Sequence, residues 1–204
     1  IDRQLLVEIG YGAAGQPTCN YVPAPEAWAS DNTECLTQDI AGANALLDEA
    51  GWTMGGNGVR EKDGVQLNMV FQTSVNAVRQ DFQALIKQWW SEIGVETELK
   101  TVDASVFFGS DPGSPDTLQK FYADVEMYAD NFEGGNPAPY LAKWTCDKAP
   151  GPDNQWQGEN ISRFCDPAYD ELLANSLALL LVKESNRTRV GTPLVGDGRL
   201  RGKL

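Results

Sequence analysis

The order of patterns between residues 37 and 102 constrains the fold of this chain most. Residues 43–50 carry apolar side chains at helical spacing, and Gly51 follows them, where helices commonly end in a left-handed residue. A region rich in Gly and polar residues extends to Gly64 and predicts turns. Residues 65–72 then alternate apolar and polar side chains. An alternation of period two predicts a strand with one buried face.

The second half of this block predicts a crossover helix and a parallel strand. Large apolar side chains recur at spacings of three and four residues and form one stripe on a helix: Phe82, Leu85, Ile86, Trp89, Trp90 and Ile93. Gly94 ends this pattern, and residues 95–100 alternate again. A strand, a helix and a strand in this length form a βαβ unit, in which the strands run parallel and the crossover is right-handed. The predicted fold class is therefore α/β.

Weaker patterns predict the remaining elements. Residues 2–11 have the spacing of a short amphipathic helix, and Thr37 is placed to cap the helix that contains residues 43–50. Residues 117–122 suggest a short helix or a helix end, residues 123–128 a buried strand, and residues 167–181 a helix. Loops are predicted where Pro, Gly, Ser and Asp gather: 17–32, 109–115, 130–139 and 148–157.

Length and charge limit the possible partners. A chain of 204 residues can build one sizeable core. It carries 16 basic and 29 acidic residues, a formal net charge of −13. Because phosphate binding needs clustered Lys and Arg, this balance argues against nucleic acid and anionic membranes as partners. No stretch reaches the apolar length of a membrane span.

The composition changes abruptly after residue 176. Six of the 16 basic residues, but only two of the 29 acidic ones, fall in residues 177–204. We therefore expect a domain of residues 1–176, followed by an atypical basic tail of residues 177–204 that is partly disordered.

The four cysteines stand at positions 19, 35, 146 and 165, in no CxxC spacing, and the chain has no His. Such separations fit a tetrahedral zinc site poorly. Disulfides are the simpler interpretation; three connectivities are possible, and the sequence-local pairs Cys19–Cys35 and Cys146–Cys165 are favoured. Disulfides imply an oxidising, extracytoplasmic compartment. Four buried free thiols in a cytosolic domain are the alternative, which the polar, loop-like surroundings of both pairs disfavour.

Several kinds of chemistry are excluded or weakly supported. Without His, neither a Ser–His–Asp nor a Cys–His arrangement can form. The glycine motifs that bind phosphates or dinucleotides are absent, and the acidic loops 111–116 and 147–153 lack the alternating carboxylates of a calcium loop, so no cofactor or metal is expected. The carboxylates Glu126 and Asp130 would suit a secreted carbohydrate-active enzyme. The loop residues Trp144 and Trp156 would line such a cleft or merely cover the sheet. A structural or adhesion domain without a ligand is a further alternative.

Short motifs follow one another in a fixed order across residues 1–175. They are ALLDEAGW at 45–52, GVREKDGVQL at 58–67, IGVETEL at 93–99, WTC at 144–146, GEN at 158–160 and RFCDP at 163–167. This ordered set resembles the peptide-type (family 5) solute-binding proteins of ABC importers, which transport dipeptides, oligopeptides or nickel.

The resemblance implies a periplasmic-binding-protein-like (type II) lobe, with a mixed, mostly parallel sheet flanked by helices. Residues 1–176 would be the C-terminal lobe, and the N-terminal lobe that closes over the solute would lie outside this sequence. The chain begins at Ile1 without a secretion signal, which under the resemblance reflects that missing part. The implied protein is a monomer and not an enzyme, extracytoplasmic (periplasmic or lipid-anchored). It would pass a small peptide or peptide-like solute to a membrane permease. The resemblance also supports the pair Cys146–Cys165.

The candidate site follows the strand of residues 123–127, at its carboxyl end, where open α/β sheets bind ligands. By the resemblance, Asp130 holds the α-amino group of a bound peptide, between Tyr128 and Asn131, through a strong charge-assisted bond. The family has Trp-Gly before this acidic turn, whereas this chain has Met127 and Tyr128, which leaves open a solute other than an ordinary dipeptide. The alternative role of Asp130 is to cap the turn beside Asn131.

Arg79 is the second candidate, since it begins the predicted helix just after the strand of residues 65–71. The resemblance implies that an Arg here pairs with a ligand carboxylate, which its planar guanidinium can bind through two hydrogen bonds. The alternative is a surface ion pair with Asp81 or Glu92. Asn76 is placed to cap the same helix.

Overall fold

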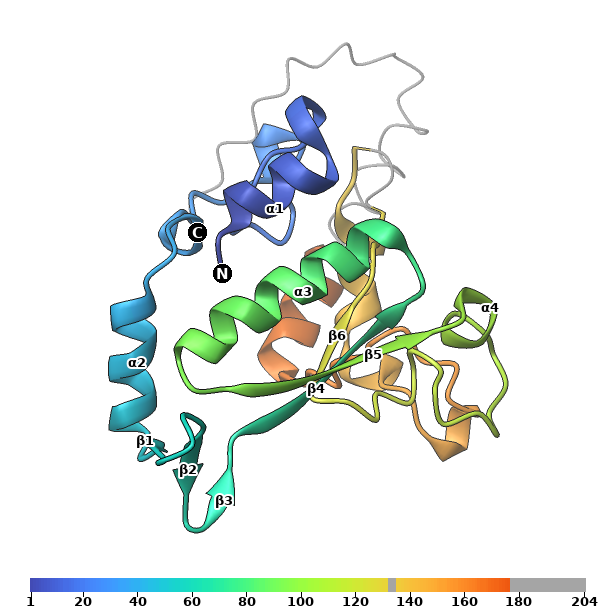
Figure 1. The fold of residues 1–204 in the computed structure, drawn as a ribbon. Helices are drawn as coiled ribbons and strands as arrows, with labels where there is room; N and C mark the ends of the chain where they lie inside the picture. The colour runs from blue at the N-terminus through green and yellow to red at the C-terminus, as the bar shows by residue number, and fades with distance from the viewer. Residues whose placement is uncertain (132–134, 177–204) are drawn as a thin grey trace, which may run out of the picture.

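The computed structural model describes residues 1–131 and 135–176 of the chain (Figure 1). The predicted tail of residues 177–204 lies outside the described residues, as does the end of the predicted helix 167–181. The helices are α1 (Arg3–Gly10), α2 (Ile40–Glu49), α3 (Ala77–Glu92), α4 (Ala104–Phe107), α5 (Ala138–Leu141) and a helix over 167–176. The strands are β1 (Thr53–Met54), β2 (Arg60–Lys62), β3 (Val65–Gln66), β4 (Asn68–Ser74), β5 (Glu96–Val102) and β6 (Val125–Met127).

The main sheet has the order β5-β4-β6, and all its described strands are parallel. β4 and β5 pair from Asn68 with Glu96 to Ser74 with Val102, and α3 connects them. The predicted strand–helix–strand unit and the α/β class are therefore confirmed. β6, which the buried run 123–128 predicted, adds to the other edge of β4.

The alternating run of residues 65–72 is not one strand, as predicted, but two. β3 belongs to a small antiparallel sheet of order β1-β2-β3, and β4 begins the parallel sheet one residue later. Leu67 lies between them: its N–H donates to the Arg60 carbonyl at 2.7 Å, and its carbonyl accepts from Glu96 N–H at 3.0 Å. Alternation does not show which strand is the partner, so the sequence pattern runs unbroken through the change of sheet, although Val65 in β3 is 61% exposed.

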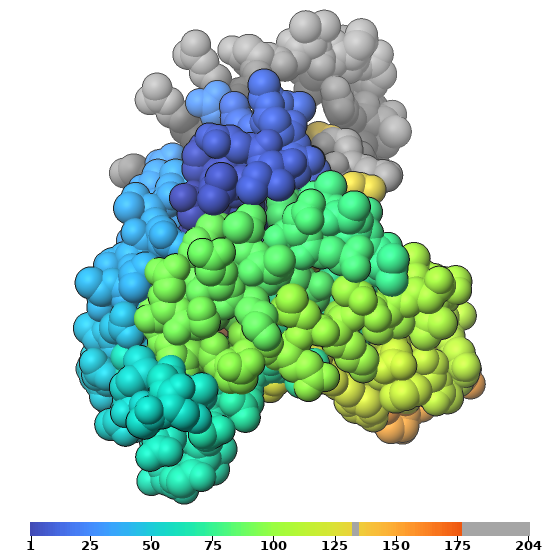
Figure 2. Space-filling model, viewed as in Figure 1, coloured from blue at the N-terminus to red at the C-terminus, as the bar shows by residue number. Residues whose placement is uncertain are grey.

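The parallel sheet is covered on both faces. α3 lies across one face, where Phe71, Ile86 and Trp89 are buried together, and α1 packs on the outer side of α3 (Figures 1 and 2). A second cluster is built largely by the segments that follow β5 and β6, and consists of Val102, Phe107, Leu118 and Ile161. The apolar stripe predicted for α3 is thus the face that it buries.

Helix starts show where local rules held and where they failed. α3 begins after Asn76, whose side chain accepts from Arg79 N–H at 3.1 Å, as predicted. The prediction of Thr37 as the cap of α2 was wrong. The N-cap is Asp39, whose carboxylate accepts from Gly42 N–H at 2.7 Å. Residues 117–122 form turns and not a helix, since Leu118 N–H is taken by the Phe107 carbonyl at 2.8 Å.

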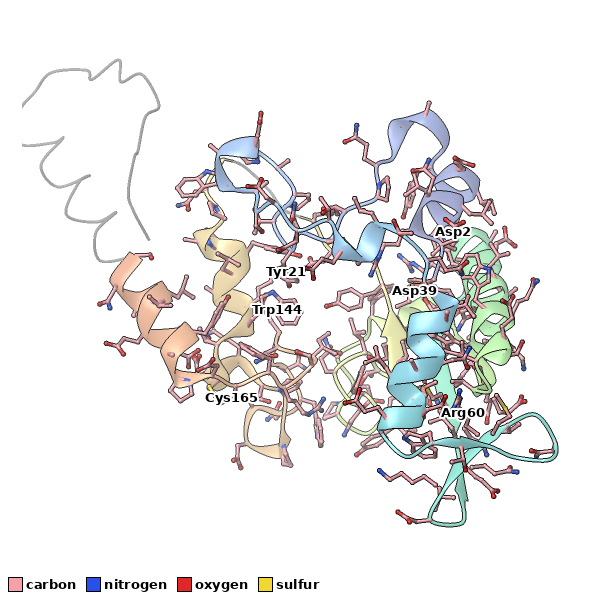
Figure 3. All side chains as sticks on the ribbon, turned by 90° about the vertical axis from the view of Figure 1, so that its left-hand side faces the viewer. Asp2, Tyr21, Asp39, Arg60, Trp144 and Cys165 are labelled. Carbon is pink, nitrogen blue, oxygen red and sulfur yellow. A yellow bond between two sulfur atoms is a disulfide. The ribbon has the colours of Figure 1, made fainter. Side chains whose placement is uncertain are left out.

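A buried guanidinium joins α2, the small sheet and the end of α3. The Arg60 residue is 2% exposed. Its side chain contacts Asp48 at 2.5 Å, the Asn44 Oδ1 at 2.7 Å and the Ile93 carbonyl at 2.8 Å, and also donates to the Trp52 carbonyl. Figure 3 shows it beneath α2, beside the β1–β3 sheet. Three of the motifs in the sequence, those of residues 45–52, 58–67 and 93–99, therefore meet at one side chain.

Both disulfides join the sequence-local pairs, Cys19 with Cys35 and Cys146 with Cys165. The four sulfur atoms are thereby unavailable to a zinc ion, and the described residues contain no other group of three or more metal-binding side chains. Within the described ranges, no helix combines the length and the apolar character that crossing a bilayer requires.

Candidate ligand-binding site

The predicted site residues come to one edge of the parallel sheet, where β4, β5 and β6 end. Tyr128 to Asn131 continue from β6, and Arg79 stands in the first turn of α3 just after β4. Parallel strands place their carboxyl ends together, which is why segments distant in sequence share this edge. Within the described part of the chain, Arg79 and Asp130 share the edge without a hydrogen bond or ion pair between them.

The Asp130 carboxylate already has a cationic partner. The Lys143 ammonium lies 3.0 Å from Oδ1 and 3.2 Å from Oδ2, and the N–H of Asn131 donates to Oδ1 at 2.9 Å. The two side chains retain 27% (Lys143) and 26% (Asp130) of their exposure. The bond to Asn131 reaches only the next residue and caps no turn among the described residues, and the ion pair with Lys143 is one that the sequence did not predict. Lys143 stands in a 3₁₀ turn, Ala142–Trp144, without a periodic pattern to signal it.

Aromatic side chains from three segments form a wall beside this ion pair. Tyr21 stacks on Tyr140 with 5.2 Å between ring centroids and meets Trp144 edge-on at 5.5 Å. Figure 3 shows Tyr21 and Trp144 facing each other from segments far apart in sequence. The Lys143 ammonium lies 5.5 Å from the Tyr140 centroid. Sequence reasoning missed Tyr21, because only tertiary packing brings its loop to this edge.

Burial disfavours the charged phenolate forms of Tyr128 and Tyr21. It raises the pKa of Tyr128 to about 12, with the charge of Asp130 as the second cause. It also raises the pKa of Tyr21 far above its ordinary value, aided by a hydrogen bond with Tyr140. Neither of these two phenols therefore adds a negative charge beside Asp130.

Two cavities adjoin at Trp144. The larger, about 570 Å³, has a mostly aromatic lining: Tyr21, Leu141, Trp144, Ser162, Phe164 and Tyr169. The smaller, about 280 Å³, lies against β6 and is lined by Glu126 and Tyr128 among others, and it shares Trp144 and Ser162 with the larger one. An apolar cavity next to a few polar groups is the usual construction of a small-molecule site.

Glu126 is one of the polar groups that line the smaller cavity. Its Oε1 accepts from Gln72 Nε2 at 2.8 Å, while its Oε2, like Trp144 Nε1, is buried without a hydrogen-bond partner among the described residues. Burial raises the pKa of Glu126 to about 8, despite the opposing effects of the Gln72 bond and of Arg163 and Lys100. An unpartnered acid and an unpartnered indole N–H suit water or a neutral polar group in this cavity.

The Arg79 side chain is hydrogen-bonded to the last residue of β4, the strand that precedes its helix. Its Nη1 donates to Ser74 Oγ at 2.5 Å, and its guanidinium carbon lies 5.7 Å from the Phe108 ring centroid. The alternative ion pairs with Asp81 or Glu92 do not form in the described structure. Since Ser74 takes one N–H group, others remain for solvent or for a ligand.

Comparison with known proteins identifies the family of the chain. Residues 1–155 match the model of the bacterial extracellular solute-binding proteins, family 5 (middle). The chain is 31% identical over 101 residues to protein XP55 of Streptomyces lividans, across 49% of this chain and 18% of that protein. It is 25% identical over 179 residues to di/tripeptide-binding protein 3 of Pseudomonas aeruginosa, across 85% of this chain and 29% of that protein.

Solved structures of binding proteins have the same fold as this chain. The structure resembles the oligopeptide-binding protein of Thermus thermophilus complexed with a pentapeptide, with a TM-score of 0.69 and 19% identity, over 85% of this chain and 30% of that one. This likeness shows the type II periplasmic-binding-protein fold. The chain spans less than a third of the length of these curated relatives. The comparisons give no support to a carbohydrate-active enzyme, and relatives with descriptive names are binding proteins. The chain belongs to the bacterial extracellular solute-binding proteins of family 5.

Proposed function

We propose that this chain is one lobe of an extracytoplasmic protein that binds a small peptide or peptide-like solute for an ABC importer. Family membership supports the class of protein, and the di/tripeptide-binding relative supports the class of solute. The observation that carries the proposal is the Asp130 carboxylate at the carboxyl edge of the sheet, beside an aromatic wall and a cavity of about 570 Å³. Such an edge gives polar contacts to the ends of a peptide and apolar contacts to its side chains.

Each predicted residue has a role in this proposal. Asp130 receives the N-terminal end of the solute, Tyr128 and Asn131 flank it, and Arg79 pairs with a carboxylate farther along the edge. Residues 1–176 form the lobe, and a second lobe outside this sequence closes over the solute by a hinge motion before delivery to the permease. The protein acts as a monomer, without a cofactor, a nucleic-acid partner or a catalytic step.

Isothermal titration with di-, tri- and pentapeptides tests the proposal, on this chain and on a longer natural chain that contains it. Because this chain supplies only part of the contacts, we expect weak, millimolar binding here and much tighter binding to the longer protein. Asp130→Asn and Arg79→Gln should each weaken binding to the longer protein by roughly tenfold or more. Asp153→Asn, a change of an exposed residue in the 3₁₀ turn Pro152–Asn154, is the matched control. Tight binding by this chain alone, or turnover of any peptide, would contradict the proposal.

A further inference from the structure

We infer that Lys143 is a built-in occupant of the Asp130 site, and that the preferred solute is a peptide-like molecule without a free N-terminal ammonium group. This inference rests on the proposed function, because it concerns the same site. It identifies the N-terminal chemistry of the solute: an acylated or otherwise uncharged end that presents a carbonyl oxygen.

The first step is the number of acceptor positions that Asp130 has left. A carboxylate offers about four lone-pair positions to donors. The Lys143 ammonium lies within hydrogen-bonding distance of both oxygens, at 3.0 and 3.2 Å, and Asn131 N–H takes another position at 2.9 Å. Roughly one position remains. A peptide ammonium, which must donate up to three hydrogen bonds, therefore competes with Lys143 for the same oxygens.

The second step is that the backbone around Lys143 is fixed on both sides. The Tyr169 hydroxyl donates to the Leu141 carbonyl at 2.7 Å, and the buried Asn160 donates to the Trp144 carbonyl at 3.3 Å. Trp144 also packs against Tyr21. The lysine stem thus begins close to Asp130, so its ammonium has an effective concentration in the millimolar range or above at the carboxylate. A free peptide at micromolar concentration meets a strong competitor.

The third step is the charge of the cluster. The Asp130–Lys143 pair is neutral as a unit, and adding a ligand ammonium would leave one positive charge in surroundings that are partly buried and aromatic. The neighbouring phenols do not offset it, since burial raises the pKa of Tyr128 to about 12. An uncharged acyl end adds no net charge, and its carbonyl oxygen can accept from the remaining N–H of Lys143.

A matched pair of probes tests this inference: Ala-Ala-Phe and N-acetyl-Ala-Ala-Phe, titrated into the longer protein that contains this chain. The wild type should bind the acetylated peptide more tightly. Lys143→Met keeps the length of the stem and removes the ammonium, so it should improve binding of the free-amine peptide about tenfold. Lys143→Arg should retain the wild-type preference. Lys148→Met is the control: it removes an exposed lysine of the next 3₁₀ turn, which is paired with Asp147 at 3.5 Å. This variant should change neither affinity.

The gain in Lys143→Met should depend on Asp130, because the freed carboxylate receives the ligand amine. The double variant Lys143→Met/Asp130→Asn should therefore lose it. If Lys143→Met does not fold, Lys143→Gln removes the same charge and takes its place. A wild type that prefers the free amine, or a preference that Lys143→Met and Lys143→Gln leave unchanged, overturns this inference and leaves the proposed function standing. Failure of both peptides to bind any variant overturns the proposed function, and this inference with it.

Discussion

Replacing Arg60 with methionine should be the most damaging single change in the small sheet. Methionine preserves most of the apolar stem but removes all five N–H donors of the guanidinium. At least three neutral acceptors then lose a partner: Asn44 Oδ1, the Ile93 carbonyl and the Trp52 carbonyl. The carboxylate of Asp48 loses one as well.

The magnitude follows from how exposed each of these groups is. The Asp48 side chain is 65% exposed, so water replaces most of what it loses, and the ion pair contributes at most about 1 kcal/mol. Each of the three neutral acceptors is in a part-buried bond, and losing its donor costs about 1 kcal/mol. We therefore expect Arg60→Met to lower the free energy of unfolding by about 3–4 kcal/mol, a large fraction of the 5–15 kcal/mol typical of a domain.

Urea denaturation followed by tryptophan fluorescence measures this effect. Asp48→Asn should cost less than about 1 kcal/mol, because it removes only the exposed ion pair. Lys62→Met is the matched control: this exposed lysine of the same strand donates to the Ala50 carbonyl at 2.8 Å, and its loss should cost less than about 0.5 kcal/mol. If Asp48→Asn cost as much as Arg60→Met, the stabilisation would come from the ion pair, and the reasoning from buried acceptors would be refuted.

Two further predictions concern stability. The pKa of Glu126 is raised to about 8 in the folded protein from an ordinary value of 4.5, so ionisation favours the unfolded state, and stability should fall as the pH rises from about 5 to 8. In denaturation at both pH values, Glu126→Gln should lose much of this decline; an identical decline in variant and wild type would show that Glu126 is not its source. Removing the disulfide with Cys146→Ala/Cys165→Ala, which opens a loop with a sequence separation of 19, should lower the free energy of unfolding by about 3 kcal/mol. A change below about 1 kcal/mol in urea denaturation would contradict that estimate.

The sequence predicted best where one period ran for several turns. The stripe of α3 marks the face that the helix buries, and the alternation of residues 95–100 locates β5, although Leu99 is 38% exposed there. Prediction failed where partners were nonlocal. Nothing near Leu67 indicates that it bonds two different sheets, and nothing near Leu118 indicates that Phe107 takes its N–H. Pattern and propensity describe neighbours in sequence, and these bonds join residues that only the tertiary fold brings together.

The same distinction explains how much of the candidate site was predicted. The positions of Asp130 and Arg79 were predicted because each follows a recognisable strand, and parallel strands end at a common edge. Lys143 was not predicted, since it reaches Asp130 from a 3₁₀ turn that directly follows the short helix α5 and has no periodic pattern of its own. Tyr21 was missed for a similar reason: its loop has no period, and its aromatic partners, Tyr140 and Trp144, are more than a hundred residues away in sequence.

The three motifs of residues 45–52, 58–67 and 93–99 lie at the opposite end of the sheet from the residues that would select the solute. Arg60 N–H donates to the Gly94 carbonyl at 2.8 Å, just before β5 begins, and Asp48 joins the same junction. Gly94 has φ of 78°, and a Cβ there would lie 2.7 Å from Arg60 Cγ, so glycine fits this contact.

These motifs therefore form a structural junction at the amino ends of the parallel strands, away from Trp144 and the site (Figure 3). A match to them identifies the scaffold and is insensitive to what the opposite edge binds. The chemistry of the solute must be read from the carboxyl edge, between residues 128 and 144, where Asp130 is paired with Lys143 and stands beside the aromatic wall. Substitutions at the junction should change stability without changing the ratio of affinities for two peptides, and substitutions of Lys143 should do the reverse.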